Sequence, residues 1–133
     1  MAITKKGDLY TWGEGSKCRL GLGFIAATSS TPNQLTPYQI ENVFDSNMVV
    51  TAGCGRTISG IAFQSGTLYT WGKSEHERPR FDDFQEYSSP YVLMEDKMIF
   101  HMSFGINHVM ALDSNGQIFG WGNSKWGCLG FGD

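Results

Sequence analysis

The sequence is poor in the features that mark several classes of protein. Only three cysteines occur in 133 residues (Cys18, Cys54 and Cys128), with no CxxC spacing and no histidine pair set for zinc. No apolar run approaches the ~18 residues of a membrane-spanning helix, and residues 1–7 hold no apolar segment of a signal peptide. We therefore expect no metal site and no membrane span, and we expect reduced thiols in a cytoplasmic or nuclear protein.

Positive charge is scarce as well. Ten Lys and Arg residues stand against thirteen Asp and Glu residues, which leaves a net charge of −3, and no basic cluster appears along the chain. Proteins bind phosphate backbones through such clusters. We therefore expect no direct nucleic-acid binding by this segment.

Glycine is the residue in excess. The chain has 17 glycines and only four prolines, and it lacks the Gly-X-Y period of collagen. A hydrophobic fraction of 41% and a charged fraction of 17% are those of a globular protein. Glycines mixed with aromatic residues predict many short strands joined by tight turns.

One short pattern occurs three times, at residues 7–13, 66–72 and 116–122. Each copy contains glycine, an aliphatic residue, an aromatic residue, a small residue, tryptophan and glycine in that order. Residues 1–24 also align without a gap on residues 110–133, which extends the repeat beyond the pattern. The signature residues are Gly7, Trp12, Gly13, Gly66, Trp71, Gly72, Gly116, Trp121 and Gly122.

The repeat predicts one propeller segment with three units. They run from about 1 to 47 (truncated at its start), 48 to 97 (complete) and 98 to 133 (truncated at its end). In the complete unit we expect strands at 48–52, 58–63, 68–71 and 91–94, the last beginning after Pro90. Ser65-Gly66 and Asn115-Gly116 predict two-residue type I′ hairpin turns. A single four-stranded sheet cannot cover its own faces, so the units must stack, as the blades of a propeller do.

The pattern resembles the repeats of the regulator of chromosome condensation family. The matching residues are Cys54-Gly55, Gly105 with His108, the three Trp-Gly pairs and the run from Asn123 to Gly130. The resemblance covers essentially the whole chain. It implies an all-β, seven-bladed propeller of four-stranded antiparallel sheets, of which this chain supplies about two and a half blades. We therefore expect a fragment of a longer protein, or a segment that further blades or a partner complete.

The chain also departs from the family pattern. Ile58 stands where the pattern has histidine, and Phe104 stands where it has cysteine. These changes lie in turns, so the prediction of blades survives them. A family site that used these positions would not carry over to this chain.

Two glycine patterns suggest nucleotide binding but lack its requirements. Residues 66–74 place five residues between the glycines where a phosphate-binding loop needs four, and their interior is strand-like. Residues 21–26 match a dinucleotide fingerprint, yet Pro32 and its neighbours allow no helix after it. No set of Ser, His and Asp suggests catalysis either. We expect no cofactor and no enzymatic activity.

Several side chains have both a functional and a structural interpretation. Trp12, Trp71 and Trp121 could stack on a ligand, but their recurrence in each unit favours packing between blades. A histidine at a turn that enters a strand could contact a partner, but a role in tying the turn to its neighbour is favoured. The residues offered as partner contacts are Asp8, Asp82, Asp83 and His108.

The function expected from these features is a non-enzymatic scaffold for protein–protein interaction, with loops that present side chains to a protein partner. The alternative implied by the resemblance is guanine nucleotide exchange on a Ran-like small GTPase. Exchange would need acidic and histidine side chains from several blades around one face. A third option is a targeting module within a longer multidomain protein.

Overall fold

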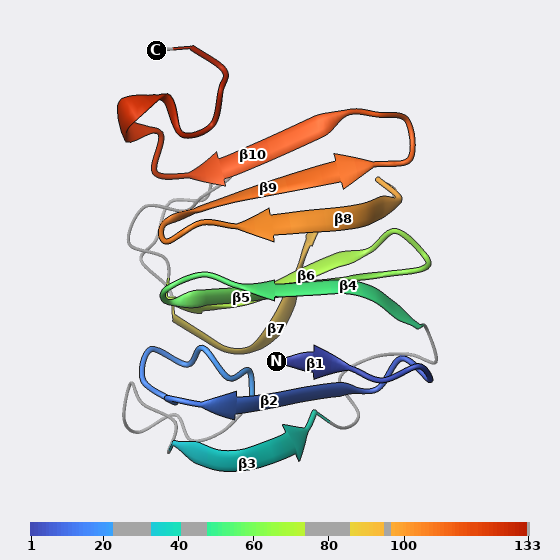
Figure 1. Cartoon of the computed structure of the whole chain (residues 1–133), viewed down its shortest axis with the longest axis vertical. Coiled ribbons are helices and arrows are strands. Elements are labelled where there is room, and N and C mark those ends of the chain that lie inside the picture. Colours follow the sequence, from blue (N-terminus) through green and yellow to red (C-terminus); the bar gives the residue numbers. More distant parts are fainter. Residues whose placement is uncertain (23–32, 41–47, 74–85, 95–96, 133) are drawn as a thin grey trace.

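The computed structural model describes residues 1–22, 33–40, 48–73, 86–94 and 97–132. They form three antiparallel sheets that follow one another along the long axis of the molecule (Figure 1). The first sheet contains β1 (Ala2–Ile3), β2 (Leu9–Gly13) and β3 (Gln34–Gln39). The second contains β4 (Val49–Cys54), β5 (Ile58–Phe63), β6 (Leu68–Lys73) and β7 (Glu86–Met94). The third contains β8 (Ile99–Phe104), β9 (His108–Asp113) and β10 (Ile118–Gly122), followed by a 3₁₀ turn at Lys125–Gly127.

The all-β prediction of stacked antiparallel blades is confirmed. The predicted number of strands holds for the second sheet only, because the first and third sheets have three strands each in the described part of the chain. The sequence analysis also missed β3, whose residues show no alternation of apolar and polar side chains that would reveal a half-buried strand.

The prediction of type I′ hairpin turns is wrong. In both turns only the glycine has a positive φ, +91° at Gly66 and +79° at Gly116, whereas type I′ needs two such residues. The amide of Gly66 donates to the Phe63 oxygen (2.8 Å), and the Phe63 amide donates to the Thr67 oxygen (3.0 Å). This is a three-residue loop in which an ordinary turn ends on a left-handed glycine, and it needs only one residue with φ > 0.

The outer strand of the second sheet is longer than predicted. β7 begins at Glu86, so Pro90 lies within the strand rather than at its first position. Among the described strands, β7 pairs with β6 alone, and the register shifts between the Thr70 and Gly72 pairings, opposite the proline. An edge strand with a bulge tolerates the missing N–H of a proline, which is why the ladder continues past this residue.

Two apolar clusters hold the three sheets together. Alternation along β6 points Tyr69 and Trp71 toward the first sheet and Leu68 toward the third. The cluster between the first and second sheets consists of Leu9, Ile40, Val49, Ile61, Phe63 and Trp71. The cluster between the second and third sheets consists of Ile58, Ala62, Leu68, Ile99, Met102, Val109, Ala111 and Trp121. The middle sheet is therefore covered on both faces.

Candidate protein-interaction surface

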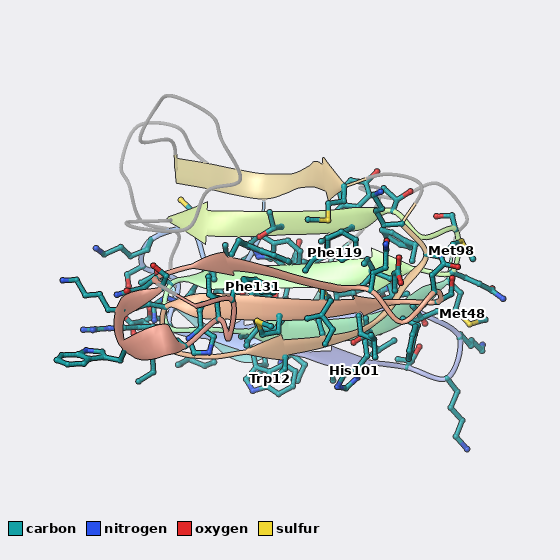
Figure 2. All side chains as sticks on the ribbon, turned by 90° about the horizontal axis from the view of Figure 1, so that it is seen from above. Trp12, Met48, Met98, His101, Phe119 and Phe131 are labelled. Carbon is teal, nitrogen blue, oxygen red and sulfur yellow. The ribbon has the colours of Figure 1, made fainter. Side chains whose placement is uncertain are left out.

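The three signature tryptophans lie in two different environments. Trp71 is fully buried between the first and second sheets, and Trp121 is buried between the second and third. Trp12 is 40% exposed, and Figure 2 shows its ring projecting beyond the strand ribbons. Trp71 faces the first sheet, which precedes its own sheet in the stack, and Trp121 faces the second. Trp12 lies on the corresponding face of the first sheet. Among the described residues, no sheet lies on that side of Trp12.

The loop after β2 closes over Trp71. The Trp71 indole N–H donates to the backbone oxygen of Arg19 (3.0 Å), and the Ser59 hydroxyl donates to the same oxygen (2.8 Å). Gly21 has a φ of +69° and lies against the indole ring, so a Cβ at this position would collide with the ring. The loop thus connects the first sheet to the second through the hydrogen bonds to the Arg19 oxygen and the close contact of Gly21 with the Trp71 ring.

The glycine that follows each tryptophan has a backbone conformation that other residues rarely adopt. Gly13, Gly72 and Gly122 have φ values of +106°, +106° and +107°. A Cβ at Gly72 would also meet the backbone oxygen of Thr57. The end of the third strand in each unit therefore requires glycine on conformational grounds.

Two of the residues predicted as partner contacts, Asp8 and His108, lie near different turns of the described part of the chain. Asp8 lies at the turn between β1 and β2, where its carboxylate accepts a hydrogen bond from the Thr4 hydroxyl (3.0 Å). His108 begins β9 next to the β8–β9 turn, with its ring against Gly105. These two turns lie at opposite ends of the strands (Figure 1). Asp82 and Asp83 lie outside the described residues.

A shallow, open cavity lies where the β4–β5 and β8–β9 turns meet. Its volume is about 570 Å³, and the Arg56 amide donates to the Ile106 oxygen across the junction (3.1 Å). His108 stands at the same end of the third sheet. The lining residues are Cys54, Gly55, Arg56, Phe104, Gly105 and Ile106.

The cavity combines a positive charge with apolar surface. Arg56 is exposed, and its guanidinium makes no hydrogen bond or ion pair with the described part of the chain. Ile106 is a large exposed apolar side chain beside it, and Cys54 adds an exposed free thiol. An acidic group next to an apolar one on a partner would match this arrangement.

Sequence reasoning missed Arg56 and Ile106. Both follow the glycine of the family's Cys-Gly-x-x-His segment, at the first of its two variable positions. The signal that could have pointed to them is that this position differs between the two repeats and lies in a turn that joins two regular strands. The sequence did not reveal that the turns of neighbouring units meet, because that depends on how the sheets stack.

Other kinds of site find no support in the described residues. Among them, no three His, Cys, Asp or Glu side chains gather as a metal ion would require. Within that part of the chain, a helix of membrane-spanning length and hydropathy does not occur. Cys18 is buried and Cys128 is exposed, and neither forms a disulfide.

Comparison with known proteins gives a consistent picture. The model of the regulator of chromosome condensation (RCC1) repeat matches residues 6–62. The ultraviolet-B receptor UVR8 of Arabidopsis thaliana is 35% identical over 135 residues, covering 99% of this chain and 29% of the receptor. The E3 ubiquitin-protein ligase HERC2 of Homo sapiens is 28% identical over 134 residues, covering 99% of this chain and 3% of the ligase.

The fold is similar to that of a solved structure as well. Yeast RCC1 (Prp20), in its complex with Kap60, has a TM-score of 0.73 at 21% identity, over 93% of this chain and 30% of Prp20. Likeness at this level of identity concerns the fold alone. The chain spans less than a third of UVR8 and of Prp20, at 29% and 30% of their lengths.

Proposed function

We propose that the chain is a non-enzymatic scaffold for protein–protein interaction, built from repeats of the kind that the regulator of chromosome condensation model matches at residues 6–62. The cavity at the junction of the second and third sheets carries the proposal. It presents the exposed Arg56 and Ile106 side chains. Paired strands on either side hold both turns, so the surface is formed before a partner arrives.

The partner that fits this surface is a protein segment with an acidic residue beside an apolar one. The Arg56 guanidinium can donate two parallel hydrogen bonds to a carboxylate. Ile106 and Phe104 offer apolar surface next to it. The complex of Prp20 with Kap60 supports protein binding as the role of this fold.

Affinity capture with matched variants tests the proposal. We expect Arg56→Glu and Ile106→Ser each to lower the retention of one specific protein by about tenfold or more. Lys5→Glu makes the same charge change at the exposed end of the β1–β2 turn, and Leu35→Ser removes an exposed apolar side chain from β3. Both control variants should retain the protein as the unaltered chain does. Equal retention by all four variants, repeated with the purified partner, would contradict the proposal.

Guanine nucleotide exchange on a Ran-like small GTPase remains the second candidate. It would place a GTPase on one face, yet Asp8 and His108 lie at opposite ends of the strands. This separation favours the scaffold. Release of labelled GDP from a Ran-like GTPase, measured with and without the chain, distinguishes the two. Faster release that His108→Ala abolishes would favour exchange, and an unchanged rate would favour the scaffold.

We also propose that the chain is one segment of a longer propeller, with units near 1–47, 48–97 and 98–133, in the cytoplasm or nucleus. The absence of a disulfide among the three cysteines and the 29% coverage of UVR8 support this. The intact mass of the native protein, detected in its own cells with an antibody to this segment, tests it. A mass several times that of the chain is expected, and a mass near 14.8 kDa would contradict it.

A further inference from the structure

Two methionines lie at the same place in consecutive repeats, each just before the first strand of its sheet. Met48 precedes β4 and Met98 precedes β8. The Met48 backbone oxygen accepts a hydrogen bond from the Gln64 amide (2.9 Å), and the Met98 oxygen accepts one from the Ser114 amide (3.1 Å). Each of these amides follows the second strand of the methionine's own sheet. The backbone of each methionine is therefore held by its own sheet.

The two side chains extend to the hairpin turn of the preceding sheet. A Cβ added at Gly7, in the β1–β2 turn, would lie 2.9 Å from the Met48 Cγ. A Cβ added at Gly66, in the β5–β6 turn, would lie 3.0 Å from the Met98 sulfur. The missing side chain of each glycine thus leaves the space that the methionine occupies. Each methionine joins two sheets that no strand ladder connects.

Met98 makes the tighter of the two contacts. Its φ of +46° is one that residues other than glycine rarely adopt. Its backbone nitrogen and Cα also lie against Gly66, where a Cβ would approach them to 2.5 and 2.7 Å. A residue in such a conformation persists only where its surroundings hold it. Loss of the contact with the turn should therefore loosen the junction at Met98 more than the one at Met48.

These two methionines are also the most accessible to solvent among the described ones. Met48 is 47% exposed and Met98 is 49% exposed, and Figure 2 shows both at one end of the sheets. Met102 is buried in the cluster between the second and third sheets. The remaining methionines are half-buried: Met1, Met94 and Met110. A small oxidant in solution would therefore reach the two methionines at the junctions first.

We propose that Met48 and Met98 form a reversible oxidation site that sets the strength of the junctions between sheets. Hydrogen peroxide transfers one oxygen atom to the thioether sulfur, so an S–O bond forms and the O–O bond breaks. Methionine is oxidised by two electrons to the sulfoxide, and the peroxide is reduced to water. Methionine sulfoxide reductase reverses the change, while a dithiol is oxidised to a disulfide and the oxygen leaves as water.

The structure explains why this oxidation would weaken the junctions. Oxidation converts a flexible apolar side chain into a polar one, and a polar group stays stable only where it finds hydrogen-bond partners. The side of the Met98 sulfur that faces Gly66 has little room for another atom. The oxidised side chain turns toward water, and its sheet loses the contact with the preceding turn.

The oxidation site is separate from the surface proposed to bind a protein. Met48 and Met98 precede β4 and β8, whereas Arg56 and Ile106 lie in the turns that follow these strands. The two sites therefore lie at opposite ends of the same strands. Neither proposal depends on the other, and a measurement of stability tests the oxidation site without any partner.

Peptide mass spectrometry after mild treatment of the folded chain with hydrogen peroxide shows where the oxygen is added. We expect sulfoxide to form at Met48 and Met98 at least about fivefold faster than at the buried Met102, because reaction follows exposure. Dithiothreitol added afterwards returns disulfides and sulfenic acids of the exposed Cys54 and Cys128 to thiols. It leaves the sulfoxides in place, so later measurements report on methionine.

Urea denaturation before and after oxidation measures the effect on the junctions. We expect the oxidised chain to unfold at a midpoint lower by about 0.5 M urea, and methionine sulfoxide reductases specific for both sulfoxide epimers should restore it. Met98→Leu keeps the apolar bulk without an oxidisable sulfur, and it should lose about half as much or less. A variant with both Met48→Leu and Met98→Leu should lose nothing. Met102→Leu, the control at a buried methionine, should lose as much as the unaltered chain.

Each variant is compared with its own unoxidised form, so a difference in starting stability does not affect the result. Any of three outcomes would overturn the proposal. Sulfoxide could form at Met102 as fast as at Met48 and Met98. The urea midpoint could stay unchanged although both exposed methionines are oxidised, or the variant with both leucines could lose as much on oxidation as the unaltered chain.

Discussion

Trp12 and Trp71 occupy the same position in consecutive repeats, and their environments differ because of what packs beside them. Trp71 is enclosed by two sheets and by the Arg19 carbonyl, whereas Trp12 is 40% exposed. The stability that a tryptophan contributes depends on the apolar area it buries and on the hydrogen bond it makes. The same residue at the same repeat position therefore need not make the same contribution to the free energy of unfolding.

Replacement of each tryptophan by phenylalanine measures this difference. We expect Trp71→Phe to lower the free energy of unfolding by about 2–3 kcal/mol, because it leaves a cavity and removes the indole hydrogen bond. Trp12→Phe, at an exposed site, should cost less than about 1 kcal/mol. Urea denaturation of both variants at a concentration where the chain is monomeric gives the two values. Equal losses would contradict this account of the inter-sheet contact.

The signature glycines show what can be predicted at the residue scale. The repeat marks Gly13, Gly72 and Gly122 as special, and their φ values near +106° give the reason. Trp12 and Trp71 fall within the same signature, but their exposure could not be deduced from it. Burial depends on which sheet faces which, and one sequence contains no direct record of that.

Among the elements, the strands near the centre of each sheet were the most predictable. The strand at 58–63 was predicted with the bounds that β5 has, because it is an apolar run buried on both faces. The outer strands β3 and β7 were missed or shortened, because edge strands tolerate proline and carry a weaker apolar pattern. The turn type was also mistaken, since the dipeptide Asn115-Gly116 is compatible with more than one loop length.

Contact between the second and third sheets depends on one departure from the family pattern. Phe104 stands in the position of the pattern's cysteine, and its ring lies against Gly53 on β4 and Gly60 on β5. A Cβ at Gly53 would overlap this ring. The Phe104 ring on β8 thus occupies the space that the two glycines on β4 and β5 leave open.

A double-mutant cycle tests this complementarity. Gly53→Ala alone should lower the free energy of unfolding by about 1–3 kcal/mol, because the added methyl group overpacks the junction. In the background of Phe104→Cys, which restores the pattern's residue, the same change should cost less than about 1 kcal/mol. Urea denaturation of the four proteins gives the coupling energy. Additive effects of the two changes would show that the ring and the glycine do not interact.

On the scale of the whole molecule, the repeat predicted the kind of fold, while the stacking created the candidate site. The cavity at Arg56 and Ile106 exists because two turns from consecutive units meet. Of the residues offered as partner contacts, Asp8 and His108 lie at opposite ends of the strands, so the sequence did not predict their separation. The proposed interaction surface lies at a junction of two units, so it becomes visible only when the units are placed side by side.

The repeat alignment permits one further test of how the units add up. Residue 133 aligns with residue 24, so residues 25–97 can be fused after residue 133 in the correct repeat register. The added segment would supply an outer strand for the third sheet and one complete sheet beyond it. It would cover Ile118 and Phe131 and place a methionine over Gly116, as Met48 lies against Gly7.

We expect this fusion, studied at a concentration where it is monomeric, to unfold in one transition at a higher urea midpoint than the unaltered chain. Burial of two large apolar side chains stabilises by on the order of 2–4 kcal/mol, and each added interface contributes to the stability of a repeat array. A fusion of residues 48–97 directly after residue 133 lacks the outer strand and the linker, and it should show no gain. A separate transition for the added unit, with the original midpoint unchanged, would mean that the third-sheet face does not accept a blade of this kind.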